Sequence, residues 1–142
     1  MTSRALLVID TSVAVKWYVP EPGAAHAAAL RHEGNQLVAP DLLTAEFGNV
    51  LWKKVRRGEL DDEEAVEIAD AFARACPVQL RPALPYSTLA LELALRFQRS
   101  VYDALYLAVA LADHGAYVTA DERLVNALAQ SDLAGVTRLL GN

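Results

Sequence analysis

Short apolar runs of strand length alternate with helical stretches along nearly the whole chain. The first run, Ala5 to Ile9 (ALLVI), is apolar without interruption, which is typical of a strand buried on both faces of a parallel sheet. This alternation predicts an α/β fold with right-handed crossover connections. We expect strands near residues 5–9, 36–39, 77–81, 117–119 and 136–139, and helices near 13–18, 24–32, 41–57, 61–74, 86–98, 101–113 and 122–130.

The length of the chain and its apolar content are those of one globular domain. With 142 residues, 54% of them apolar, we expect a single domain over residues 1–142. The one cysteine, Cys76, cannot form an intrachain disulfide, which favours a reducing compartment. The apolar runs 5–9 and 104–112 are too short for a secretory signal or a bilayer span. The sequence therefore predicts a soluble cytoplasmic protein with no membrane segment.

Two carboxylates closely follow predicted strands. Asp10 comes directly after the first strand, and Asp121 comes two residues after the strand 117–119. Ligands of open parallel sheets collect beyond the carboxyl ends of the strands, so we expect both side chains at the same edge of the sheet. Each aspartate could instead cap the helix that follows it, a frequent role for this residue type. The sequence leaves both roles open.

Two further acids lie in predicted helices. Asp103 precedes the stretch 104–112, which has no polar face and predicts a buried helix. Ser100 and Asp103 have the spacing of a capping box, but an ionised acid in so apolar an element also needs a partner or a cation. Glu46 lies at the margin of the apolar stripe of the helix 41–57, a position that also fits an ordinary boundary glutamate.

Four carboxylates gathered within several ångströms would repel each other unless a cation neutralised them. Mg²⁺ fits such a group, because it binds a few carboxylate oxygens, keeps several waters and leaves positions open for phosphate. Thr11, Ser12 and Thr119 lie beside the acids and could orient waters or carboxylates. Such a site suits phosphodiester hydrolysis, because the metal activates a bound water and screens the charge of the transition state. The three histidines are assigned no catalytic role.

A basic run follows Glu46 on the same predicted helix and could contact an anionic polymer; it consists of Lys53, Lys54, Arg56 and Arg57, with Lys16, Arg96 and Arg99 as extensions. Such a run also suits the negative end of a helix dipole. The net charge of the chain is −5, which taken alone argues weakly against nucleic acid. Four aromatic residues are interpreted as core or interface residues rather than base-stacking platforms: Trp17, Trp52, Tyr102 and Tyr106.

Four segments resemble, in order, the successive signatures of PIN-domain ribonucleases: Val8–Trp17 (VIDTSVAVKW), Pro40–Glu46 (PDLLTAE), Tyr102–Ala108 (YDALYLA) and Thr119–Leu124 (TADERL). Each motif is short, but four in this order and at this spacing make a specific signal that covers almost the whole chain. The size of the chain is most similar to that of the VapC-type toxins of toxin–antitoxin pairs.

The resemblance implies a PIN-like three-layer α/β/α fold with a central, mostly parallel sheet of about four to five strands. It implies a Mg²⁺- or Mn²⁺-dependent endoribonuclease, a homodimer and a cognate VapB-like antitoxin. The catalytic acids would be Asp10, Glu46, Asp103 and Asp121. Of these, Asp10 and Asp103 would bind the metal, and the supporting hydroxyls would be those of Thr11, Ser12 and Thr119.

Other classes of protein also place an acid after the first strand. A phosphatase that forms an aspartyl phosphate expects the pattern D-x-D, but here Asp10 is followed by Thr11 and Ser12. A response-regulator receiver expects paired acids near that strand and a lysine after a late strand, where this chain has Ala120 and Asp121. A third alternative is a non-catalytic binding module in which the acids only cap helices.

Overall fold

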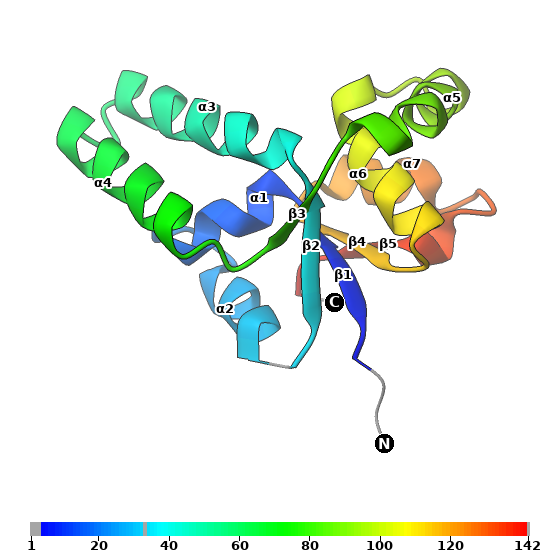
Figure 1. Ribbon diagram of the computed structural model, residues 1–142, viewed down its shortest axis with the longest axis horizontal. Coiled ribbons are helices and arrows are strands. Elements are labelled where there is room, and N and C mark those ends of the chain that lie inside the picture. Colours follow the sequence, from blue (N-terminus) through cyan, green and yellow to red (C-terminus); the bar gives the residue numbers. More distant parts are fainter. Residues whose placement is uncertain (1–3, 33, 142) are drawn as a thin grey trace.

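A five-stranded sheet forms the centre of the molecule (Figure 1). The computed structural model describes residues 4–32 and 34–141. The strand order is β3-β2-β1-β4-β5 and all four pairings are parallel. The strands are β1 (Leu6–Ile9), β2 (Gln36–Pro40), β3 (Gln79–Arg81), β4 (Ala116–Thr119) and β5 (Thr137–Leu139). Each lies where the sequence pattern predicts one, with ends that differ by one or two residues.

Helices cover both faces of this sheet and make three layers. Figure 1 shows α1 to α4 on one side of the sheet and α5 to α7 on the other, as right-handed crossovers require for this strand order. The α-helices are α1 (Thr11–Ala14), α2 (Ala24–His32), α3 (Leu42–Arg56), α4 (Asp62–Arg74), α5 (Ser87–Phe97), α6 (Val101–Ala112) and α7 (Glu122–Leu128). Three short 3₁₀ turns complete them: η1 (Val15–Trp17), η2 (Leu84–Tyr86) and η3 (Ala134–Val136).

The predicted helix 13–18 is present but begins two residues earlier and is divided into two short turns. The chain forms the single α-turn α1 and then tightens into η1. Two β-branched residues in this stretch, Val13 and Val15, are buried in the core, and valine is a weak helix former. Both features are consistent with a helix that remains short.

Two predicted helix starts are confirmed by their hydrogen bonds. At α4, the Asp61 carboxylate accepts from the Glu64 N–H at 2.7 Å and the Glu64 carboxylate accepts from the Asp61 N–H at 3.2 Å, which is a complete capping box. At α6, the Ser100 hydroxyl accepts from the Asp103 N–H at 3.1 Å. The cap at α6 uses the backbone of Asp103 and leaves its carboxylate available for other contacts.

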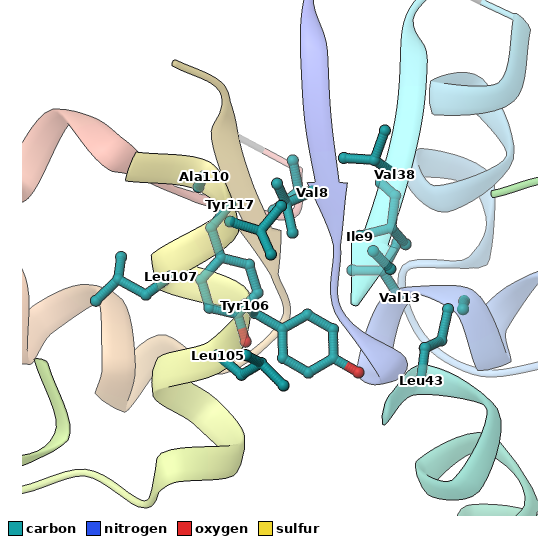
Figure 2. Close-up of a cluster of buried hydrophobic side chains, with 14 of the residues drawn as sticks. Val8, Ile9, Val13, Val38, Leu43, Leu105, Tyr106, Leu107, Ala110 and Tyr117 are labelled. Carbon is teal, nitrogen blue, oxygen red and sulfur yellow. The ribbon is translucent and has the colours of Figure 1, made fainter. Parts of the chain in front are cut away.

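Helix α6 is buried as its sequence predicts. All of Ala104 to Ala110 is buried, and the helix packs against β1, β2 and β4. Figure 2 shows Tyr106 of α6 and Tyr117 of β4 side by side in this core, below Val8 of β1. Their rings stack at 5.5 Å between centroids. The core thus carries two phenol groups into the region below the end of β1.

No helix in the described part of the chain is long and apolar enough to cross a membrane.

The strand order places a topological switch point between β1 and β4, because the chain runs outward from β1 in both directions. Ligands of open α/β sheets bind at such a point, beyond the carboxyl ends of the strands. Ile9 of β1 pairs with Val118 of β4, so the residues that follow, Asp10 and Thr119, stand next to each other at this edge.

Candidate active site

Asp10 is held at the end of β1 by three hydroxyl groups. Its Oδ2 accepts from Ser12 Oγ at 2.6 Å and from Thr119 Oγ1 at 2.7 Å, and its Oδ1 accepts from the Tyr117 phenol at 3.1 Å. The side chain makes no capping bond to α1, although Asp10 occupies the N-cap position. The capping alternative for Asp10 is therefore wrong, because its oxygens are committed to hydroxyls from β4 and the turn after β1.

The two hydroxyl groups that donate to Oδ2 of Asp10 have fixed orientations. Ser12 Oγ also accepts from the Ala120 N–H at 3.1 Å, and Thr119 Oγ1 accepts from the Asp121 N–H at 3.0 Å. Since a backbone N–H can only donate, each hydroxyl must point its own proton at Asp10. The backbone after β4 thus orients the donors that hold the carboxylate.

Burial raises the pKa of Asp10 despite these three hydrogen bonds, which act to lower it, and the charge of Asp103 raises it further. The pKa of Tyr117 is raised well above its ordinary value by burial and by the charge of Asp10. Tyr117 therefore stays protonated and donates. The structure keeps a carboxylate in a place where its negative charge is unfavourable, which is typical of functional sites.

Glu46, on α3, lies near Asp10. Its Oε1 accepts from the Tyr106 phenol at 2.6 Å and from Thr11 Oγ1 at 3.2 Å, and these two hydroxyl oxygens lie 2.9 Å apart. The pKa of Glu46 is raised, first by burial and then by the charges of Asp10 and Asp103. Glu46 and Asp10 lie close together, because Thr11, which bonds to Glu46, directly follows Asp10, and the two tyrosines that hold these acids stack on each other. Asp103 lies about one turn before Tyr106 on α6, and these three acids with Asp121 are called the acidic pocket.

Arg99 joins Asp103 to Asp121. Its Nη2 lies 3.3 Å from Asp103 Oδ2 and 3.2 Å from Asp121 Oδ2. The other oxygen of Asp121 accepts from the Leu124 N–H at 3.2 Å and caps α7. The capping role predicted for Asp121 is confirmed. The second oxygen of Asp121, Oδ2, contacts Arg99. Asp121 therefore lies at the rim, linked to Asp103 by a shared cation.

The four acids offer carboxylate oxygens as metal ligands, and hard divalent cations prefer such oxygens. Within residues 4–32 and 34–141, Glu46 Oε2 and Asp103 Oδ1 accept no hydrogen bond from the protein. In the same ranges, no three His, Cys, Asp or Glu side chains are already arranged to hold a metal ion. Asp103 Oδ2 faces Arg99 instead. The carboxylate oxygens suit Mg²⁺ or Mn²⁺.

The basic run on α3 is not a uniform surface. Lys54 is only 8% exposed, and its Nζ lies 2.6 Å from Glu21 and 3.3 Å from Glu59. The Glu21 contact raises the pKa of Lys54. Lys54 therefore stabilises the fold, and its assignment as an RNA contact is corrected. Lys53, Arg56 and Arg57 are exposed, with Arg56 stacked over Trp52.

The proposed extensions of the basic run also have internal partners. Lys16 lies 3.3 Å from Glu21, Arg96 pairs with Asp132, and Arg99 belongs to the acidic pocket. The aromatic interpretations hold in part. Tyr106 is a core residue and Trp17 is half-buried, but Trp52 and Tyr102 are 54% and 63% exposed, so these two do not belong to the core. All three histidines are exposed.

Sequence reasoning missed the two tyrosines that support the acids. Tyr117 lies two residues before Thr119 on β4, so both side chains point to the same face of the sheet. Tyr106 lies three residues after Asp103 and shares its helix face. Both spacings could have identified the tyrosines as neighbours of the pocket. Their apolar surroundings favoured a role in the core instead, and they also have that role.

The chain is an α/β protein with an all-parallel sheet and acidic residues at its switch point. Comparisons with known proteins identify its family. The model of the family described as "PIN domain" matches residues 7–128. The chain belongs to the PIN-domain family. It is 34% identical over 121 residues to Ribonuclease VapC3 of Pyrobaculum aerophilum, covering 83% of this chain and 91% of that protein.

Two further comparisons give a second relative and a solved structure of similar fold. Ribonuclease VapC1 of Mycobacterium tuberculosis is 38% identical over 91 residues, which are 63% of this chain and 65% of that protein. The crystal structure of PAE2754 from Pyrobaculum aerophilum superposes with a TM-score of 0.70 at 22% identity, covering 97% of this chain and 92% of that one. The PIN-like three-layer fold is thereby confirmed.

The aspartyl-phosphate alternatives find no support. A receiver has the strand order 2-1-3-4-5, whereas here β3 lies at the outer edge beside β2. At the second acid position of the phosphatase pattern stands Ser12, whose hydroxyl donates to Asp10. A serine there supports the first carboxylate and cannot replace a second one.

Proposed function

We propose that this chain is a metal-dependent endoribonuclease of the VapC type. The observation that supports the proposal is that Tyr117 and Tyr106, which stack on each other, hold Asp10 and Glu46 at the switch point of a PIN-domain sheet, with Asp103 one turn before Tyr106. Two proteins to which the chain is similar are named ribonucleases. RNA is the proposed substrate, and its phosphodiester bond is the bond that is hydrolysed.

Asp10 and Asp103 are the proposed metal ligands, with Glu46 and Asp121 completing the pocket directly or through water. A bound Mg²⁺ or Mn²⁺ would supply a water of lowered pKa and positive charge against the phosphate. Ser12, Thr119 and Tyr117 hold Asp10 in one orientation, and Tyr106 and Thr11 hold Glu46 by Oε1 only. Glu46 Oε2 can then accept a proton from the attacking water, and its raised pKa makes it a better base than an exposed carboxylate.

Calorimetry with Mn²⁺ separates this proposal from a non-catalytic binding module. We expect one saturable Mn²⁺ site in the wild type, and an affinity roughly 10-fold to 100-fold lower in Asp103→Asn, because a ligating charge is removed. Asp132→Asn is the matched control, since Asp132 is exposed and pairs with Arg96 away from the pocket. Equal Mn²⁺ affinity in wild type and Asp103→Asn would refute the proposed site.

The exposed cations of α3 are the proposed track for RNA. Lys53 and Arg57 lie about 10 Å and 16 Å along the helix from Glu46, at about 1.5 Å per residue. Reversing both to Glu should weaken RNA binding on the order of 10-fold and flatten its salt dependence, because two phosphate contacts are lost. Mn²⁺ affinity should not change. Binding is measured by fluorescence anisotropy with a non-cleavable RNA at several salt concentrations.

The matched control reverses two exposed arginines elsewhere, Arg74 and Arg138. Both double variants change the net charge from −5 to −9, since each reversal subtracts two from the wild-type value. If the control weakens RNA binding as much as Lys53→Glu/Arg57→Glu does, only total charge matters and the track along α3 is wrong.

We further propose that the chain acts in the cytoplasm as a homodimer and as the toxin partner of a VapB-like antitoxin. Two apolar surfaces support partners of this kind. One lies on α5, η2 and the start of α6, where Leu84, Leu91, Leu95 and Tyr102 are exposed, and the other lies between α3 and α4 around Trp52 and Val66.

A neighbouring short reading frame whose product copurifies with the chain tests the toxin assignment. A strictly monomeric mass by light scattering would contradict the dimer.

A further inference from the structure

Arg99 occupies an unusual position for a cation of an RNA-binding protein, because it lies inside the acidic pocket. It follows α5, after Gln98 in the left-handed conformation with φ 54°, and its backbone N–H donates to the Ala94 carbonyl at 3.2 Å. This turn directs the side chain back across the first turn of α6. A single nitrogen, Nη2, then reaches both Asp103 and Asp121.

The bonding of Arg99 is incomplete. Its side chain is 23% exposed, and its Nε is buried without a hydrogen-bond acceptor in the described part of the chain. A guanidinium has five N–H donors in a planar fork. Here one Nη nitrogen makes both ion pairs, so this geometry is not the paired, bidentate contact that binds an arginine most strongly. The contact therefore holds Asp103 without fixing Arg99 firmly in place.

Arg99 and a divalent cation would compete for the same carboxylate. A Mg²⁺ ion at about 2.1 Å from an Asp103 oxygen would lie within several ångströms of the Arg99 guanidinium, and like charges at this distance repel strongly in a partly buried site. Arginine does not lose its charge at any ordinary pH. It can only change its partner, and its fork matches a phosphate.

Building on the proposed metal-dependent function, we propose that Arg99 is a partner-exchanging residue. It binds Asp103 and Asp121 until a divalent cation binds Asp103, and it then turns to a phosphate of the RNA. Arg99 would thus position Asp103 before the metal binds and would bind substrate afterwards. This role goes beyond an extension of the basic run on α3, because the exchange takes place within the acidic pocket.

The test compares Mn²⁺ affinity and RNA affinity in one set of variants. Arg99→Gln should bind Mn²⁺ about 3-fold to 10-fold more tightly by calorimetry, because the competing cation is gone, a gain in the range of a partly exposed ion pair. With Mn²⁺ saturating, the same variant should bind a non-cleavable RNA about 10-fold more weakly, with a salt slope smaller by about one. A residue with a purely structural role would not move these two affinities in opposite directions.

Two further variants control this test. Arg96→Gln removes an arginine of the same segment that pairs with Asp132 and stacks on Phe97, and neither affinity should change. Arg99→Lys keeps the charge without the fork, so its Mn²⁺ affinity should stay near that of the wild type while its RNA affinity falls. Circular dichroism confirms that each variant is folded.

The outcomes distinguish this inference from the proposed function. If Arg99→Gln binds Mn²⁺ no more tightly than the wild type, Arg99 does not compete with the metal and the inference is wrong. If Mn²⁺ binding tightens but RNA binding is unchanged, the transfer of Arg99 to phosphate is wrong. If the wild type binds no Mn²⁺ at all, the proposed metal-dependent function itself fails.

Discussion

Replacing Asp10 with asparagine should lower RNA cleavage on the order of 1,000-fold or more and, at the same time, raise the thermal stability of the metal-stripped protein. Activity should fall because the charge of a proposed metal ligand is lost, and removal of such a group from a metal-assisted hydrolase has large effects on the rate. Stability should rise because the charge of the partly buried Asp10 is unfavourable there, as its raised pKa indicates, and the charge of Asp103 adds to this effect. Opposite signs for activity and stability are the signature of a functional residue.

Asparagine fits the hydrogen bonds of this position. Its amide oxygen can take the place of Oδ2 and accept from Ser12 and Thr119, whose donors are fixed by backbone N–H groups. Its NH₂ group then faces Tyr117, whose phenol oxygen can accept as well as donate. Both side chains thus keep a hydrogen bond to each other, so the variant is expected to keep the fold.

The pH dependence follows from the raised pKa of Asp10. Between the unfolded pKa of about 3.9 and the higher folded pKa, the native protein binds more protons than the unfolded chain does. Stability therefore falls as the pH rises through this window and stays reduced above it. Asp10→Asn removes that loss. After EDTA treatment at pH 7.5, its Tm should exceed the wild-type Tm by roughly 3–8 °C, equivalent to about 1–2 kcal/mol in a domain of this size.

Asp132→Asn provides the matched control for stability. Asp132 is exposed and its pKa is lowered by its hydrogen bond with Arg96, so its charge is favourable in the folded protein. The control should gain no Tm at pH 7.5. An Asp10→Asn protein that cleaves RNA within 10-fold of the wild-type rate, or that melts below the wild type, would show that Asp10 is a structural residue.

Much of this fold could be predicted from local patterns. Strands such as β1 and helices such as α6 are recognisable because their apolar periodicity depends on their own residues. The strand order could not be predicted, because it depends on which strands pair across long stretches of chain. The split between α1 and η1 was also beyond the sequence pattern, which predicted one short helix there.

The same distinction applies to the site. Three of the candidate acids, Asp10, Asp103 and Asp121, could be identified because each stands at a strand end or a helix start. Glu46 was identified from its place at the margin of an apolar helix stripe. The roles of their neighbours depend on contacts between distant segments. Lys54 meets Glu21 across 33 positions and Tyr117 meets Asp10 across 107, and neither contact leaves a local signal. A charge run predicts an exposed surface only on average, and burial of Lys54 is the exception here.

Chelation of divalent cations should abolish RNA cleavage, and Mg²⁺ or Mn²⁺ should restore it. Apart from Arg99, which pairs with Asp103 and Asp121, the pocket supplies carboxylates and hydroxyls, so its own residues can position RNA and accept a proton but offer little positive charge against a phosphate. Cleavage is followed on a fluorescent RNA after EDTA treatment and again after readdition of 5 mM MgCl₂ or MnCl₂. Cleavage that persists unchanged in EDTA would end the proposal of a metal-dependent nuclease.

Bound metal should also stabilise the fold, and the effect should depend on pH. At a metal concentration about 100 times Kd, mass action stabilises the native state by about 2.7 kcal/mol, a Tm increase of roughly 5–10 °C. The pKa values of Asp10 and Glu46 are raised by burial and mutual repulsion, so protons compete with the metal as the pH falls. The Tm gain with Mg²⁺ or Mn²⁺ should therefore be larger at pH 7.5 than at pH 5. The Tm of Asp10→Asn should rise little with metal at either pH. This variant has lost one of the charges proposed to bind the cation, and with it the repulsion between carboxylates that the cation relieves.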